Sequence, residues 1–141
     1  MVGIEISVRW CDDDLVELSI LASNGRFSGE VSAYASHDTA TSFAAALRGF
    51  PNDGTDARQF EIGTFDPSFA GGGARFEFGC LTCTGRAFVD VRLHGDGRRA
   101  HRPESASFGI EIQAASIDVF VRELTQLAAR VGESASLCAA S

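Results

Sequence analysis

Most of the chain alternates apolar and polar residues with a period of two, and this pattern limits the fold more than any other feature. The opening segment is typical, because Ile4, Ile6 and Val8 alternate with Glu5 and Ser7. Successive side chains of a β-strand point to opposite faces, so each such segment has one apolar and one polar face. The alternating segments are residues 4–10, 16–22, 27–35, 58–65, 74–80, 87–93 and 106–112.

Short connections join several of these predicted strands into hairpins. Asn24-Gly25 separates the second and third strands, and both residue types tolerate the positive φ of a tight hairpin turn. Gly85 lies in the short connection between residues 74–80 and 87–93, which indicates a second hairpin. A run of three aspartates at residues 12–14 does not continue a strand without self-repulsion, so it predicts a turn.

The period changes from two to about 3.6 in two segments, and each predicts an amphipathic helix. The first runs from Asp38 to about Phe50, with Ser36 or Asp38 as its cap and Gly49 at its end. The second begins after Ser116 as the N-cap and ends before Gly132. Its apolar stripe consists of Ile117, Phe120, Val121, Leu124, Leu127, Ala128 and Val131.

The predicted order of elements is therefore βββ-α-ββββ-α, an α+β fold. Strands with one apolar face need a cover, and two amphipathic helices provide one. We expect a largely antiparallel, twisted sheet of about six or seven strands with both helices packed on one face. Residues 1–132 form a single domain in this prediction, and residues 133–141 form a flexible C-terminal tail.

The net charge of −7 is confined to the first half of the chain. Residues 1–66 contain eleven acids and four arginines, whereas residues 67–141 contain eight of each. This distribution argues against nucleic acid or an anionic membrane as the partner and favours a basic protein. The acidic residues that we select as candidate partner-binding residues are Asp12, Asp13, Asp14, Asp53 and Asp56.

The spacing of Cys80 and Cys83 is the one pattern that suggests metal or redox chemistry. A zinc site commonly needs a second cysteine pair, but Cys11 and Cys138 are isolated. A redox motif needs a helix after the first cysteine to lower its pKa, and this region is predicted as strand and turn. We expect structural cysteines, no metal and no cofactor, with a zinc site as the alternative.

Three further patterns favour ordinary structure over a site. The glycines at residues 71–73 are not followed by a helix or a Lys-Ser/Thr pair, so they predict a loop and not a phosphate site. No nucleophile-elbow pattern such as Gly-x-Ser-x-Gly accompanies His37, His94 and His101, which favours surface histidines. The basic loop containing Arg98, Arg99 and Arg102 lacks interleaved aromatic residues, which favours a solvated loop.

Several segments carry a family resemblance. They are residues 25–29 (GRFSG), 42–47 (SFAAAL), 74–78 (ARFEF), 85–91 (GRAFVDV) and 108–112 (FGIEI), followed by Ile117, Phe120 and Leu124. Over roughly residues 15–130 the chain resembles the WapI-type immunity proteins and a related bacterial family of unknown function. Those immunity proteins often carry Asp-Gln before the last helix, where this chain has Gln113-Ala114, which favours the sister family. The resemblance implies a small cytoplasmic domain that neutralises a toxin by binding it, and it transfers no binding residue.

Together these observations predict a non-enzymatic protein-interaction domain that uses an acidic surface, with self-association as a further possibility. The alternative is a small-molecule-binding or catalytic domain, with a pocket between sheet and helices near His37 or His94. No apolar run reaches the roughly 20 residues of a membrane span, and no basic, then apolar, leader opens the sequence. We therefore expect a cytoplasmic protein with reduced cysteines.

Overall fold

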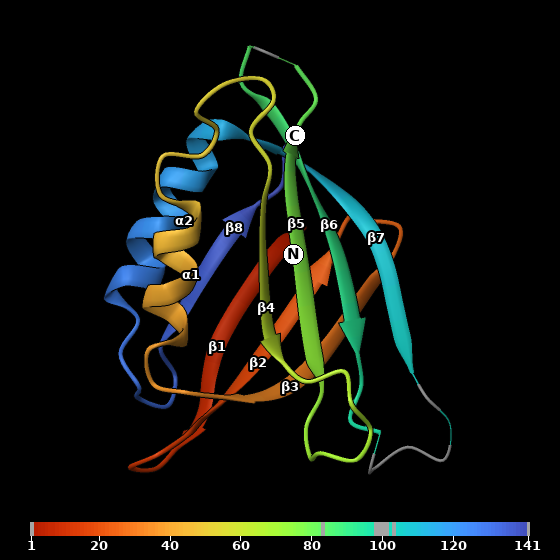
Figure 1. The fold of residues 1–141 in the computed structure, drawn as a ribbon, viewed down its shortest axis with the longest axis vertical. Coiled ribbons are helices and arrows are strands. Elements are labelled where there is room, and N and C mark those ends of the chain that lie inside the picture. Colours follow the sequence, from red (N-terminus) through yellow and green to blue (C-terminus); the bar gives the residue numbers. More distant parts are fainter. Residues whose placement is uncertain (1, 83, 98–101, 103, 141) are drawn as a thin grey trace.

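The chain folds into two four-stranded antiparallel sheets and two helices (Figure 1). The computed structural model describes residues 2–82, 84–97, 102 and 104–140, and the element counts refer to these. Sheet A has the strand order β3 (Ser28–Ala35), β2 (Val16–Ser23), β1 (Gly3–Cys11) and β8 (Ser134–Cys138). Sheet B has the order β4 (Arg58–Gly63), β5 (Gly73–Cys80), β6 (Arg86–His94) and β7 (Ser105–Gln113).

The predicted alternation is confirmed in the strands of both sheets, because less exposed side chains alternate with more exposed ones along most of their length. Ile4, Ile6 and Ile20 of sheet A are at most 1% exposed, as are Phe76 and Val89 of sheet B. Burial of these large side chains stabilises the fold by roughly 1.5–3 kcal/mol each. The inner faces of the two sheets therefore supply one continuous core.

The helices α1 (Thr39–Leu47) and α2 (Ala114–Gln126) lie side by side at one flank of the molecule (Figure 1). There α1 packs against α2 and β4, while α2 packs against β8. Phe43 of α1 is the centre of this packing, with its ring 4.5 Å from Phe60, 5.3 Å from Phe76 and 5.5 Å from Phe120. The helices thus connect sheet B to sheet A. Neither helix is long and apolar enough to cross a membrane, in the part of the chain that the structure describes.

The expected α+β class and antiparallel pairing are confirmed, but the strands form two sheets instead of one sheet of six or seven strands. Helices of nine and thirteen residues are only about 13 and 20 Å long, too short to cover a sheet of that width. The second sheet provides the missing cover. At one end β3 crosses β4, β5 and β6, where a side chain on Gly29 would lie 2.8 Å from Leu93.

The predicted flexible tail is instead largely a strand. β8 pairs with β1 in antiparallel register, and its Ala135 and Leu137 are at most 1% exposed. The segment is short and made of small residues, so its alternation gives a weak sequence signal. It is nevertheless ordered because β1 has a free edge and the core has space for Leu137.

The second helix differs from its predicted limits at both ends. It begins at Ala114, so Ser116 lies inside the helix and does not cap it. It ends at Gln126, and Val131 is 67% exposed instead of belonging to the apolar stripe. The chain then turns through Gly132, whose φ of 96° suits a glycine, and enters β8.

Candidate functional site

The five aspartates selected from the sequence do not share a surface. Asp12, Asp13 and Asp14 lie in the turn between β1 and β2, and Asp53 and Asp56 lie in the connection between α1 and β4. These two segments are at opposite ends of the molecule (Figure 1). The structure therefore does not unite them into one acidic patch.

Three of these carboxylates are also engaged within their own loops. Asp12 accepts hydrogen bonds from the backbone N–H groups of Leu15 and Asp14, which lower its pKa. Asp53 accepts from the hydroxyl and N–H of Thr55, which lowers its pKa in the same way. These bonds shape the turns and leave less of each carboxylate for a partner.

Asp56 is the most strongly engaged of the three. Its carboxylate forms a two-oxygen ion pair with Arg58, with contacts of 2.8 and 2.9 Å, and this pairing lowers the pKa of Asp56 and raises that of Arg58. The Asp56 side chain is only 13% exposed. Arg58 also donates to the carbonyl of Ala46 at the end of α1, so the pair holds the loop against the helix.

The other sequence patterns occupy structural positions. Gly72 donates its N–H to the carbonyl of Ser32 at 2.7 Å, and Gly71 lies against Tyr34, so the glycines at 71–73 let β3 approach sheet B closely. The Cys80 thiol lies 3.4 Å from the carbonyl of Asp53. Cys83, Arg98, Arg99 and His101 lie outside the described residues, and Arg102 is exposed. No cluster of metal-ligating side chains occurs in the described ranges.

The space near His37, where the alternative function places a pocket, is almost filled. A hollow between His37, β1, β2 and the residues after α2 has a volume of about 10 Å³, roughly enough for one water molecule. His94 lies elsewhere, on the outer face of sheet B, with its ring 5.7 Å from that of Phe65.

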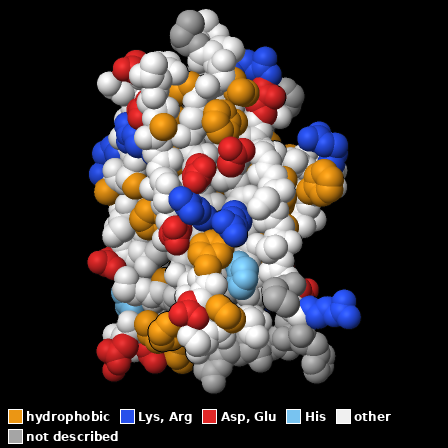
Figure 2. Space-filling model, turned by 45° about the vertical axis from the view of Figure 1, so that its right-hand side comes forward, with side chains coloured by type: hydrophobic (Ala, Val, Ile, Leu, Met, Phe, Trp, Pro, Cys, Tyr) orange, Lys and Arg blue, Asp and Glu red, His pale blue; other side chains and the backbone are white. Residues whose placement is uncertain are grey.

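The outer face of sheet B gathers charged side chains from three neighbouring strands. Two rows cross the strands there, and cross-strand pairing sets each row. The carboxylate row consists of Gln59, Glu77, Asp90 and Gly109. The arginine row consists of Glu61, Arg75, Arg92 and Ser107. We call the two rows together the charged face, and Figure 2 shows acidic and basic side chains gathered next to one another on it.

Like charges stand directly opposite each other in both rows. Arg75 of β5 is the register partner of Arg92 of β6, and Glu77 is the partner of Asp90. Direct cross-strand pairs of like charge destabilise a sheet, whereas opposite charges stabilise it. Arg75 relieves part of this repulsion, because its Nε lies 3.2 Å from a Glu77 oxygen and 3.8 Å from a Glu61 oxygen.

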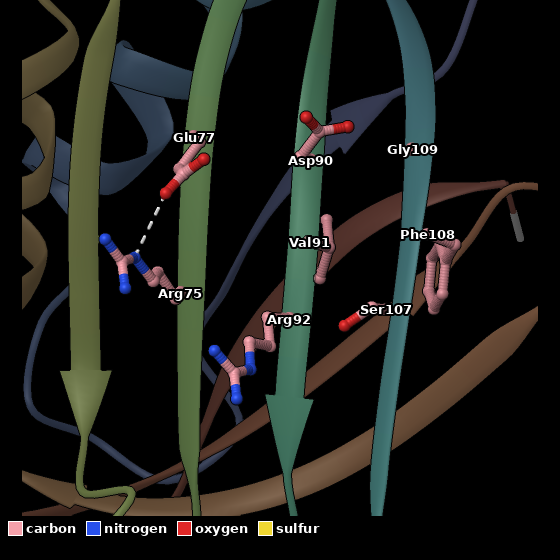
Figure 3. A pocket seen from close by; sticks show the side chains of 8 residues that line it. All are labelled: Arg75, Glu77, Asp90, Val91, Arg92, Ser107, Phe108 and Gly109. Atoms are coloured by element: carbon pink, nitrogen blue, oxygen red, sulfur yellow. Dashed lines mark ion pairs between the residues drawn. The ribbon is translucent and has the colours of Figure 1, made fainter.

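Arg92 and Asp90 remain without an ion pair among the described residues, although they project from the same face of β6. The Arg92 guanidinium lies over the ring of Phe65, 5.7 Å from its centroid, which holds the cation in place. In Figure 3 the Arg92 side chain extends toward β5 while the Asp90 carboxylate points toward the other end of the strand. Both side chains are exposed, so a cation and an anion are presented to solvent side by side.

A hollow of about 420 Å³ lies on this face between Arg75, Asp90, Arg92 and Gly109 (Figure 3). A second hollow of about 560 Å³ shares Asp90 and Gly109 with it and continues past Phe88 toward Val2. The two form one groove across β6 and β7. Gly109 is at the point where they join.

Gly109 keeps this groove open, although the backbone conformation at this position does not require a glycine. Its φ is not positive, and a Cβ there would meet only a carboxylate oxygen of Asp90, at 3.1 Å. Glycine weakens a strand, by roughly 0.5–1 kcal/mol relative to alanine. Gly79, the other glycine nearby, differs because the Phe88 ring covers it, with a Cβ position 2.6 Å from that ring.

The free edge of β7 is already occupied in part. The side chain of Asn24 donates to the Gly109 carbonyl at 3.0 Å, and the N–H of Ala140 donates to the Glu111 carbonyl at 2.8 Å. An extended peptide cannot add to the edge at these two carbonyls without displacing them.

Sequence analysis did not select Arg75, Glu77, Asp90, Arg92 or Gly109. A signal for the four charged residues was present in the sequence, because residues 74–80 and 87–93 form a predicted hairpin in which these side chains occupy outward positions. Comparison with models of protein families found no match, and neither did comparison with curated proteins or with solved structures. The resemblance to WapI-type immunity proteins thus remains a prediction.

Proposed function

We propose that this chain is a non-enzymatic protein-interaction domain that binds its partner through the charged face of sheet B. The observation that carries the proposal is the direct opposition of Arg75 to Arg92 and of Glu77 to Asp90. Local arrangements that oppose stability are typical of functional surfaces, since selection keeps them only for a gain elsewhere.

The charges define the chemistry of the partner. Side chains two residues apart on a strand are separated by about 6.6 Å, so the two rows are roughly that far apart. A complementary protein presents cations to Glu77 and Asp90 and, next to them, carboxylates to Arg75 and Arg92. Complementary charges of this kind contribute to specificity and association rate more than to affinity.

This proposal replaces the aspartate patch as the binding surface and keeps the predicted class of function. An immunity-like role, with a toxin as the partner and the cytoplasm as the location, is one form of it, and an adjacent toxin gene would support that form. The three described cysteines, Cys11, Cys80 and Cys138, form no disulfide with one another.

The test is an exchange of charge within β6, in which Asp90→Arg is combined with Arg92→Asp. This exchange variant keeps the composition and the net charge, but it inverts the two rows at β6. The immobilised wild-type chain is used to capture proteins from an extract of the native cell. We expect the amount captured to fall at least tenfold with the exchange variant.

The matched control is the corresponding exchange in sheet A, Arg9→Glu with Glu30→Arg, which reverses an exposed ion pair of 3.3 Å. It should retain the same captured proteins as the wild-type chain. Capture of the same proteins in equal amounts by all three chains would contradict the proposal, as would a loss with the sheet A control alone.

A further inference from the structure

The charged face is complementary to itself, and this deepens the proposed function, on which it rests. We propose that the partner is a second copy of this chain, bound face to face. The two-fold axis runs across the strands, between the carboxylate row and the arginine row. In this arrangement each strand lies over the same strand of the second copy, in the opposite direction.

Rotation about this axis places each row over the other row of the second copy. Arg75 then faces Glu77 of the second copy, and Arg92 faces Asp90 of the second copy. The symmetry repeats each contact, so four ion pairs form. The like charges that oppose each other within one copy are thereby all paired with opposite charges.

The outer strands of the sheet match under the same rotation. On β4, the Gln59 amide faces the Glu61 carboxylate of the second copy, to which its NH₂ group can donate. On β7, Ser107 of the second copy faces Gly109, where the absent side chain leaves space. All four register positions of each row therefore meet a compatible group, which a rotation about an axis parallel to the strands does not provide.

The size of the face indicates a weak, reversible dimer. Four strands about 4.8 Å apart, with side chains, cover about 500 Å² per copy. A standard stable interface buries about 800 Å² per partner. The net charge of −7 on each copy adds a repulsion that the four pairs must overcome. Association should therefore be detected at high protein concentration.

The decisive experiment again uses the exchange variant of Asp90 and Arg92. In the proposed dimer β6 faces β6, so two exchange variants still pair Arg with Asp, as two wild-type chains do. A mixture of wild type and exchange variant instead brings Arg over Arg and Asp over Asp. The proposal thus predicts that like copies associate and unlike copies do not.

The three pairings are compared by sedimentation velocity at constant salt, with one component carrying an amine-reactive dye. The sequence contains no lysine, so the dye attaches only at the α-amino group. We expect wild type with wild type, and variant with variant, to give similar dimer constants. The mixed pair should associate at least tenfold more weakly, a difference that generic attraction between acidic proteins does not produce.

Two results would overturn this inference. A wild-type chain that stays monomeric up to about 1 mM, where a Kd of that size still yields dimer, excludes the second copy as partner. Equal association in all three pairings excludes the proposed axis. In either case, capture of another protein that depends on the charged face would still support the proposed function. If no such protein is captured, the proposed function is contradicted as well.

Discussion

The outer faces of the two sheets differ, although both belong to four-stranded antiparallel sheets with the same inward alternation. Across the middle of sheet A runs a row of four serines, Ser134, Ser7, Ser19 and Ser32, one from each strand. These side chains are small, and Arg9 of β1 reaches past them to Glu30 of β3, at 3.3 Å. Across sheet B, by contrast, arginine opposes arginine and carboxylate opposes carboxylate.

The two sheets differ in the charge pairs on their outer faces. Sheet A also carries Glu5, Glu17 and the exposed Trp10 and Tyr34, but among its described residues no two like charges are direct cross-strand partners. Opposed like charges, and the groove kept open at Gly109, lower stability without contributing to the core. This contrast within one molecule supports our proposal that these features of sheet B serve binding.

The inner faces of the two sheets should contribute equally to stability, and substitutions there have the largest expected effect. Ile20→Ala in sheet A and Ile110→Ala in sheet B each remove a side chain that is at most 1% exposed. Each should lower the free energy of unfolding by about 2–5 kcal/mol, as measured by urea denaturation. A loss below 1 kcal/mol for only one of them would break the comparison.

Exchange of Asp90 and Arg92 should instead increase stability. The two like-charge pairs of β5 and β6 become pairs of opposite charge, while the contact of Arg92 with Phe65 is lost. We expect the free energy of unfolding to rise by about 1 kcal/mol at low salt, and by less at 1 M salt. A drop in stability would mean that the wild-type arrangement supports the fold.

Gly109→Val probes the groove. Valine suits a strand better than glycine, and its Cβ meets only the mobile Asp90 carboxylate. Stability should increase by about 0.5 kcal/mol, as seen in the urea midpoint, while association through the charged face weakens. Unchanged association would show that the groove is not part of the interface.

The smallest effect belongs to sheet A. Glu30→Gln removes an ion pair whose two side chains are each at least half exposed, so it should cost no more than about 0.5 kcal/mol. Circular dichroism melting at two salt concentrations would detect it. Its association behaviour should equal that of the wild-type chain, because Glu30 lies on the other sheet.

The sequence predicted individual elements better than their assembly. The seven predicted strands and two predicted helices all occur in the structure, with different limits for the helices, because alternation and helical spacing are local properties. The pairing of β8 with β1 is not local, and the SASLC segment of β8 has too few large residues to reveal a strand. The division into two sheets likewise depends on which strands meet, which periodicity does not encode.

The candidate site followed the same rule. A count of charges pointed to the aspartates of residues 1–66, yet those at the β1–β2 turn and those before β4 lie far apart (Figure 1). The charged face lies mostly in the electrically neutral half of the chain. The opposition of like charges on this face results from the register of β5 on β6, and only a structure gives the neighbours of each charge.

The pairing of β1 with β8 also sets the order of events during synthesis. β1 must wait for residues 134–138 before its second edge is covered, and Ala139 then donates its N–H to the carbonyl of Val2. Sheet A is therefore completed only after residues 134–138 have left the ribosome. Until then the backbone N–H and C=O groups along one edge of β1 are unpaired, so a nascent chain that pauses before residues 134–138 is the form of this protein most in need of a chaperone.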